Sequence, residues 1–141
     1  MPMTSTQQAL YQRIENYAFD EAPAAVPFHT KLGKDNGWSL RYTARAITQY
    51  RRFAFLAVAA NHPVAPSDTV DQVWHLHLLH SRSYWGRFCE QVLAAPLHHQ
   101  PTEGGEQERE KFEQWYTRTL ECYREYFGEA PPADIWPAAI A

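Results

Sequence analysis

The sequence predicts an all-α protein: a compact single-domain bundle of four to five helices with a Pro-rich C-terminal tail packed on it. Apolar residues recur at intervals of three and four in several segments, which is the spacing of one face of an α-helix. No segment alternates apolar and polar residues in the way that a half-buried strand would. The 141 residues, 45% of them hydrophobic, suffice for one core, so we expect residues 1–141 to form one domain.

Three helical segments are predicted in the N-terminal half. The first begins near Thr6 and ends before Pro23, because proline lacks the amide that a helix interior needs. A short helical turn is expected over residues 28–32. The third helix begins after Ser39, whose hydroxyl can cap the free amides of the first turn. Its second half, FAFLAVAA, is apolar on all sides, which places this helix at the centre of the fold.

The stretch from Ser67 to Cys89 is the most distinctive part of the chain. Ser67 is predicted to be its N-cap, and no proline follows until Pro96, so one long helix is expected. At about 100° per residue, Asp71 and His75 lie on one flank of that helix. The members of its predicted buried face are Val70, Trp74, Ser81, Trp85 and Phe88, whereas Val73, His77, His80 and Tyr84 lie on the other flank.

The C-terminal part is predicted to hold one more strong helix. A loop containing His98 and His99 leads to it, and the helix runs from about Glu106 to Phe127 with a wide aromatic stripe. Gly128 suits the left-handed cap that ends many helices. The Pro-rich segment that follows is expected to be held to the body by Ile135 and Trp136.

A metal site is the main functional prediction. Asp71 and His75 are four residues apart, so both side chains reach the same side of a helix, and His99 on the following loop is the third candidate ligand. One carboxylate and two imidazoles suit one divalent transition metal: Zn, Fe, Mn or Ni. His77 is an alternative ligand or a hydrogen-bond donor behind the ligands, although it lies about 200° around the helix from His75. His98 is a second alternative.

Other interpretations of these residues stay open. The Asp71 carboxylate could orient His75 by a hydrogen bond without any metal, and the histidines could satisfy polar groups beside a Trp-rich core. Trp74, Tyr84 and Trp115 are predicted to line a pocket or the core. The catalytic residues, if the protein is an enzyme, are unknown at this stage.

Several classes of function are disfavoured by what the sequence lacks. It has no His-Glu-x-x-His, Gly-x-Ser-x-Gly, Cys-x-x-Cys or phosphate-binding glycine loop. The net charge of -3, with Lys and Arg spread along the chain, argues against nucleic acid as a partner. No apolar run spans a bilayer and no secretory signal is visible, so we expect no membrane insertion. Two cysteines make no disulfide framework, and a cytoplasmic location is predicted.

A resemblance to a known family is carried by Val70-Asp71-Gln72-Val73-Trp74-His75-Leu76-His77, by Tyr84 and Cys89, by Leu97-His98-His99, and by Asp134-Ile135-Trp136-Pro137. Over about residues 27–137 these motifs resemble the glycine-rich domain-containing protein-like family. The resemblance implies that members are alike at Asp71, His75, His77 and His99. Bacterial relatives place such a domain before transmembrane segments, and plant relatives carry a glycine-rich tail connected with RNA and stress. The present sequence has neither feature, so neither context is transferred.

Two functions compete at this point. The first is a metal-binding helical domain of unknown substrate, which becomes a small metal-dependent enzyme if the ion keeps an open coordination position. The second is a non-enzymatic protein–protein interaction module in which the Trp and His residues are structural. The first predicts loss of metal when His75 or His99 is replaced, and the second predicts no bound metal.

Overall fold

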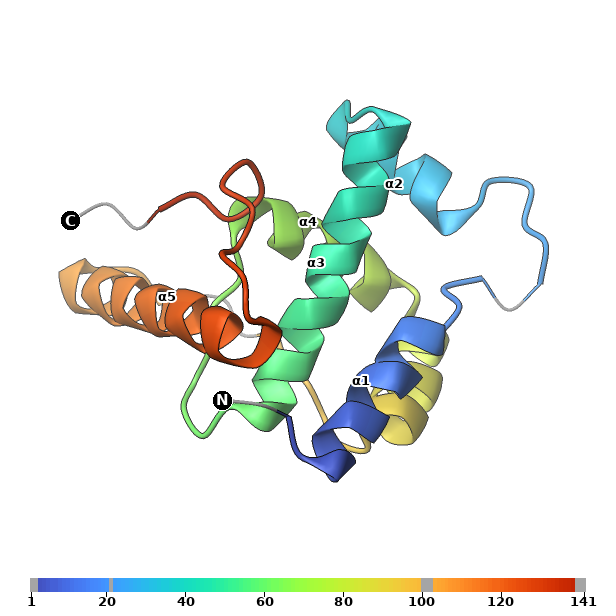
Figure 1. The fold of residues 1–141 in the computed structure, drawn as a ribbon. Helices are drawn as coiled ribbons and strands as arrows, with labels where there is room; N and C mark the ends of the chain where they lie inside the picture. The colour runs from blue at the N-terminus through green and yellow to red at the C-terminus, as the bar shows by residue number, and fades with distance from the viewer. Residues whose placement is uncertain (1–2, 21, 100–102, 139–141) are drawn as a thin grey trace.

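The described part of the chain consists of six helices and contains no strand. The computed structural model describes residues 3–20, 22–99 and 103–138. In chain order the helices are α1 (Ser5–Asn16), α2 (Phe28–Asn36), α3 (Leu40–Ala59), α4 (Asp68–Leu79), the π-helix η1 (Arg82–Leu93) and α5 (Glu106–Phe127) (Figure 1). The all-α prediction is confirmed, and six helices in these ranges exceed the predicted four to five. A single domain over residues 1–141 stays a prediction, because the described ranges are shorter.

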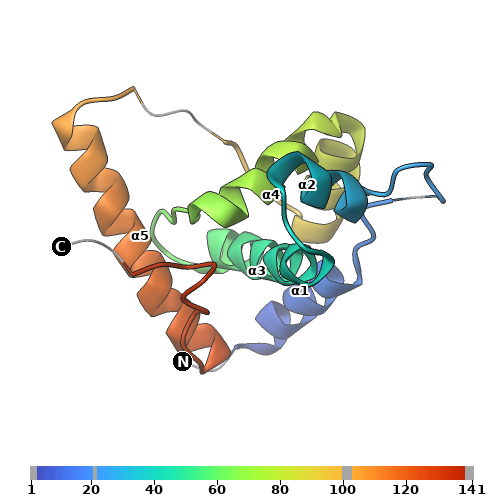
Figure 2. The same ribbon diagram turned by 90° about the horizontal axis from the view of Figure 1, so that it is seen from above.

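Helix α3 is the centre of the fold, and the other five helices all contact it. Ser39 caps it as predicted, since its hydroxyl oxygen accepts from the Tyr42 amide at 3.1 Å. Its apolar second half supplies a buried run over residues 53–56. In Figure 2, α5 lies on one side of α3, and α4 and η1 lie on the other.

The additional helices arise at two places where the local sequence departs from the expected pattern. The segment predicted as a short turn over residues 28–32 continues to Asn36, and Gly37 ends it in the left-handed conformation with φ 70°. The stretch predicted as one long helix is divided in two at His80. Within the described residues, the prediction of a single helix from Ser67 to Cys89 is therefore wrong.

The break at His80 has a local cause. The Ser67 cap is confirmed, because its hydroxyl accepts from the Val70 amide at 3.2 Å. At the other end of α4, the His80 ring Nδ1–H donates to the Leu76 carbonyl at 3.0 Å. That carbonyl would accept from the His80 amide in a continuing α-helix. The His80 amide bonds to His77 instead, and the chain leaves helical geometry with ψ 65°.

Helix η1 has the wider winding of a π-helix, in which each amide bonds five residues back. Its buried residues, Tyr84, Phe88, Cys89 and Leu93, recur at intervals of four and five, as this winding requires. The predicted buried face assumed 3.6 residues per turn and therefore placed Trp85 inside. Trp85 is 37% exposed, and Tyr84 is fully buried in its place.

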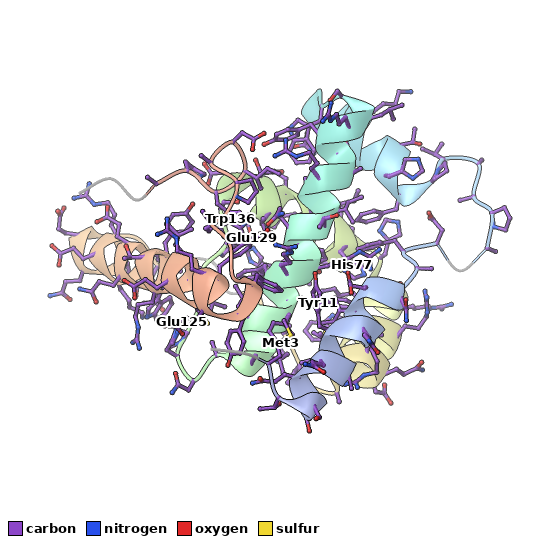
Figure 3. The ribbon with its side chains drawn as sticks, in the orientation of Figure 1. Met3, Tyr11, His77, Glu125, Glu129 and Trp136 are labelled. Atoms are coloured by element: carbon purple, nitrogen blue, oxygen red, sulfur yellow. The ribbon has the colours of Figure 1, made fainter. Side chains whose placement is uncertain are left out.

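Helix α5 packs on α3 directly and is also connected to it through the C-terminal segment. The helix has the predicted bounds, and Gly128 closes it in the left-handed conformation with φ 68°. Ile135 and Trp136 are buried, at 1% and 2% exposure. Trp136 lies between α5 and α3 (Figure 3). Its indole N–H donates at 3.0 Å to the Gln49 carboxamide oxygen, which also accepts from the Tyr123 hydroxyl at 2.8 Å.

The helices are too polar or too short to cross a lipid bilayer, as far as the described residues extend.

Candidate metal centre

Helix α4 places Asp71 and His75 one turn apart at the surface of the protein. The side chains are 27% and 47% exposed, and one Asp71 oxygen lies 3.1 Å from the His75 Nε2. This proximity follows from the spacing of four residues, which brings side chains onto the same side of an α-helix. The same helix carries His77 to the opposite side.

The loop after η1 brings His99 to these two residues. The Ala94 backbone is left-handed, with φ 55°, and the chain turns back there toward α4. The His99 Nε2 lies 2.7 Å from the other Asp71 oxygen and 2.9 Å from the His75 Nε2. The His99 side chain is 23% exposed, and its ring packs against the Trp74 ring with a centroid distance of 4.4 Å. Three ligand atoms, one from each residue, lie within 4.8 Å of one another.

The two Nε2 atoms and the Asp71 carboxylate all carry lone pairs, so their close approach needs a proton or a cation between them. A neutral imidazole carries one N–H, so the Nε2···Nε2 contact needs a proton on one of the two nitrogens. A proton on the His99 Nε2 can point well at only one of its two neighbours, the Asp71 oxygen or the His75 nitrogen. A cation at the meeting point is attracted by all three atoms at once. The donor set of two imidazoles and one carboxylate fits Zn and the mid-row transition metals.

His77 belongs to the core and lies between α1 and α3 (Figure 3). It is 1% exposed, with its Nδ1 at 2.8 Å from the Tyr50 hydroxyl and its Nε2 at 2.9 Å from the Tyr17 hydroxyl. Burial, with smaller contributions from the nearby His80, Arg51 and Arg87, lowers the pKa of His77 to about 3. The ring is therefore neutral at pH 7. Both ring nitrogens have partners, so a ligand role would cost one of these hydrogen bonds.

The neutral ring accommodates its partners in one consistent arrangement. In the tautomer with the proton on Nε2, the Tyr50 hydroxyl donates to Nδ1, the Nε2–H donates to the Tyr17 hydroxyl, and the Tyr17 hydroxyl donates to Ser83, so that all these groups are satisfied. The roles of Tyr17, Tyr50 and Ser83 in this network were not predicted from the sequence. A signal was available: Tyr17 and Tyr50 occupy apolar helix faces, and a hydroxyl buried there needs a partner.

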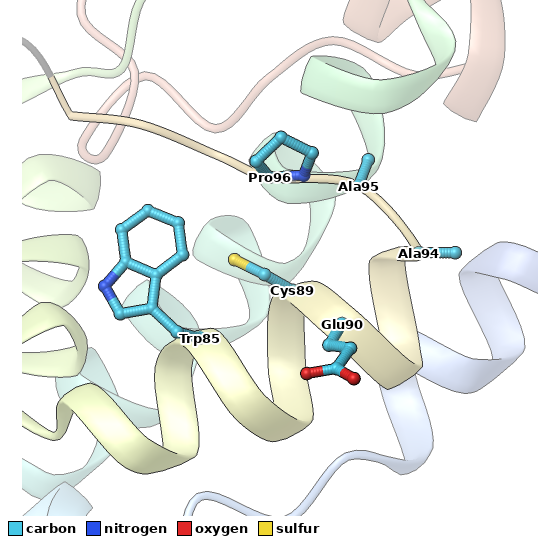
Figure 4. A pocket seen from close by; sticks show the side chains of 6 residues that line it. All are labelled: Trp85, Cys89, Glu90, Ala94, Ala95 and Pro96. Atoms are coloured by element: carbon cyan, nitrogen blue, oxygen red, sulfur yellow. The ribbon is translucent and has the colours of Figure 1, made fainter.

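His98, the other alternative ligand, lies beside Trp85. It is exposed, and its ring lies 5.1 Å from the Trp85 ring. Beside Trp85 there is an open hollow of about 380 Å³, lined also by Cys89, Glu90 and residues 94–96 (Figure 4). Cys89 is buried, and burial raises the pKa of its thiol, which suits a core residue better than a nucleophile.

The three residues predicted to line a pocket or the core have different positions. Trp74 and Tyr84 are buried, and both lie behind the loop that carries His99. Trp115 is half-buried on α5, where its ring contacts Phe112 at 5.2 Å and lies 4.9 Å from the Lys111 ammonium. Trp115 thus packs on neighbours from its own helix.

Comparison with known proteins assigns the chain to a different family from the one that the motifs suggested. No curated protein and no solved structure matches the chain. The assignment to the glycine-rich domain-containing protein-like family is wrong, because the matching family is a different one, UCP032817-like, which is uncharacterised. The resemblance rests on short motifs such as Asp-x-x-Trp-His-x-His, and these do not by themselves identify the family. The match to the UCP032817-like family extends over residues 11–132, and the chain belongs to that family.

Proposed function

We propose that this protein binds one divalent transition-metal ion through Asp71, His75 and His99. The observation that carries the proposal is the approach of three ligand atoms from three side chains to within 4.8 Å of one another. Two of the side chains come from one turn of α4 and the third from a loop 24 residues after His75. Structural zinc sites usually have four protein ligands, whereas catalytic sites have three and keep a position for water or substrate. Three protein ligands at a surface site therefore favour an open centre.

The donor set limits which ions suit the site. Two imidazoles and one carboxylate fit Zn, Fe, Mn or Ni, and they leave coordination positions open in either four- or six-coordinate geometry. The Nε2 atoms of His75 and His99 are 2.9 Å apart, which is close enough for both to bind one ion.

An open centre of this kind supplies a Lewis acid. It can lower the pKa of a bound water for hydrolysis, or hold a small substrate by its oxygen atoms. The 47% exposure of His75 leaves the metal accessible from solvent, which such chemistry requires. We propose a small metal-dependent enzyme whose substrate reaches the ion from the His75 side.

Metal content tests the proposal. Wild-type protein, purified without a tag, is expected to hold about one equivalent of metal by elemental mass spectrometry, and His75→Ala and His99→Ala are expected to lose it. His29→Ala, which removes an exposed histidine on α2, is the matched control and should keep the metal. Full metal content in both site variants, or none in wild type after reconstitution, would refute the proposal. The visible spectrum of the Co²⁺-loaded protein distinguishes six-coordinate from four-coordinate binding, because tetrahedral Co²⁺ absorbs far more strongly.

A second candidate function, an interaction surface for a protein partner, is favoured by one observation. Trp85 is 37% exposed and stands over the hollow formed with Cys89 and residues 94–96. Exposed tryptophans are frequent anchors in protein interfaces. Under this function the protein holds no metal, and a chelator leaves its melting temperature unchanged.

A further inference from the structure

A buried hydroxyl group bonds to the loop that carries His99, beside the Cys89 thiol, which also interacts with the Leu97 backbone. Tyr84 of η1 is fully buried, and its hydroxyl accepts from the Trp74 indole N–H at 2.8 Å. The same hydroxyl donates to the backbone carbonyl of Leu97, two residues before His99. The Tyr84 hydroxyl therefore accepts one hydrogen bond from α4 and donates one to the loop, and these two bonds connect α4 to the loop.

Trp74 provides a second connection from Tyr84 to His99. Its ring is 6% exposed and packs on the His99 imidazole with a centroid distance of 4.4 Å and an angle of 59° between the planes. The Tyr84 bond fixes the rotation of the indole, because the N–H must point at the hydroxyl. The position of the indole in turn limits where the His99 ring can lie. Tyr84 thus acts on His99 through the loop backbone and through Trp74.

The π-helical winding of η1 puts Tyr84 in this place. Its wider turn directs Tyr84 inward together with Phe88 and Cys89. The Cys89 carbonyl accepts from the Ala94 amide and, at 3.0 Å, from the Ala95 amide, so η1 also fixes the start of the loop. π-Helical segments are rare and often occur at functional sites. Here the segment supports the loop from which the third candidate ligand projects.

We infer that Tyr84 is a positioning residue of the metal centre, which holds the His99 imidazole against Asp71 and His75 before the ion binds. This inference rests on the proposed function. Residues that orient metal ligands without touching the metal commonly change metal affinity 10- to 100-fold. Removal of the Tyr84 hydroxyl leaves the Leu97 carbonyl and the Trp74 indole N–H without this partner, so that part of the ordering of His99 must take place when the metal binds. We expect a roughly tenfold or larger loss of affinity.

The test is a double-mutant comparison of metal affinity. Co²⁺ is titrated into metal-free wild type, Tyr84→Phe, His99→Ala and the double variant, at a temperature where circular dichroism shows each to be folded. Tyr84→Phe is expected to weaken binding about tenfold or more in the wild-type background. In the His99→Ala background only weak Co²⁺ binding by Asp71 and His75 is left, and Tyr84→Phe is expected to change that weak affinity less than twofold. Tyr116→Phe is the matched control, because it removes a hydroxyl that also donates to a backbone carbonyl, that of Pro137 on the tail. It should bind as wild type does.

A metal-free readout separates this inference from the proposed function. In wild type, the Trp74 ring should shift the His99 ring protons in the NMR spectrum, and Tyr84→Phe should reduce that shift. Equal Co²⁺ affinity in wild type and Tyr84→Phe would overturn the inference and leave the metal site standing. An equal loss in the His99→Ala background would also overturn it, since the effect would then be general loosening. No Co²⁺ binding by wild type would overturn the proposed function and this role together, even if the NMR shift depends on Tyr84. If Tyr84→Phe does not fold, Trp74→Phe takes its place and must also lose affinity only while His99 is present.

Discussion

The buried His77 should make the stability of the protein depend on pH in a defined window. The pKa of a histidine is about 6.5 in the unfolded chain, and that of His77 is lowered to about 3 in the folded protein. Between these values the unfolded state binds the extra proton, so the free energy of unfolding rises with pH. The contribution of His77 is fully present above pH 6.5 and is lost progressively as the pH falls toward 3.

The size of the effect follows from the distance between the working pH and 6.5. Each pH unit below 6.5 costs about 1.4 kcal/mol. At pH 5 the loss caused by His77 is therefore about 2 kcal/mol, and at pH 4 it is about 3 kcal/mol. These amounts are large against the 5–15 kcal/mol typical of a whole domain.

Urea unfolding between pH 8 and pH 4, with a chelator present to keep the site metal-free, measures this dependence. His77→Gln cannot take up the proton, so its free energy of unfolding should fall by about 2 kcal/mol less than that of wild type between pH 8 and pH 5. His29→Gln, at an exposed position on α2, controls for the loss of a histidine. Parallel pH curves for wild type and His77→Gln would refute the assignment of this dependence to His77.

Three further outcomes are expected. Gln49→Leu should lower the free energy of unfolding by about 2–4 kcal/mol in urea titrations, because the Tyr123 hydroxyl and the Trp136 indole both lose their buried acceptor. Ala94→Gly should raise it by about 1 kcal/mol, since the φ of 55° strains any residue with a Cβ atom; an unchanged midpoint would contradict this reading of the turn. Under the proposed function, free metal at 100 times its Kd should add about 2.7 kcal/mol of stability. Calorimetry should find this gain in wild type and not in Asp71→Asn.

The sequence predicted helices well wherever capping and periodicity were local. Ser39, Ser67 and Gly128 cap the helices as expected, because each cap depends on a hydrogen bond or backbone angle within a few residues. The break at His80 was not predicted, since it depends on a side chain replacing a backbone amide at one carbonyl. The winding of η1 was not predicted, because the expected buried face was drawn for an α-helix with 3.6 residues per turn. As a result Trp85 was placed on the buried face, whereas Tyr84 is the residue that is buried.

Prediction of the site was limited in the same way. The proximity of Asp71 and His75 follows from their spacing alone, and the helix projection correctly separated His75 from His77. The approach of His99 to these two residues depends on the left-handed turn at Ala94. A glycine at this position would have indicated such a turn, but the residue is alanine. Whether these three side chains bind metal stays a prediction. The family was assigned wrongly because the resemblance rested on short motifs, whereas the family model matches residues 11–132 as a whole.

The carboxamide of Gln49 has a consequence for how the protein opens. Its oxygen atom, on α3, accepts one hydrogen bond from Tyr123 of α5 and another from Trp136 of the C-terminal segment. Both donors are far from Gln49 along the chain. Release of either segment breaks its own bond to this oxygen and exposes to water the carboxamide to which the other segment is bonded. Helix α5 and residues 134–136 should therefore open as one cooperative unit in hydrogen exchange. The Asp71 and His75 side chains lie on α4 and His99 lies on the loop after η1, so none of the three candidate ligands belongs to this predicted unit.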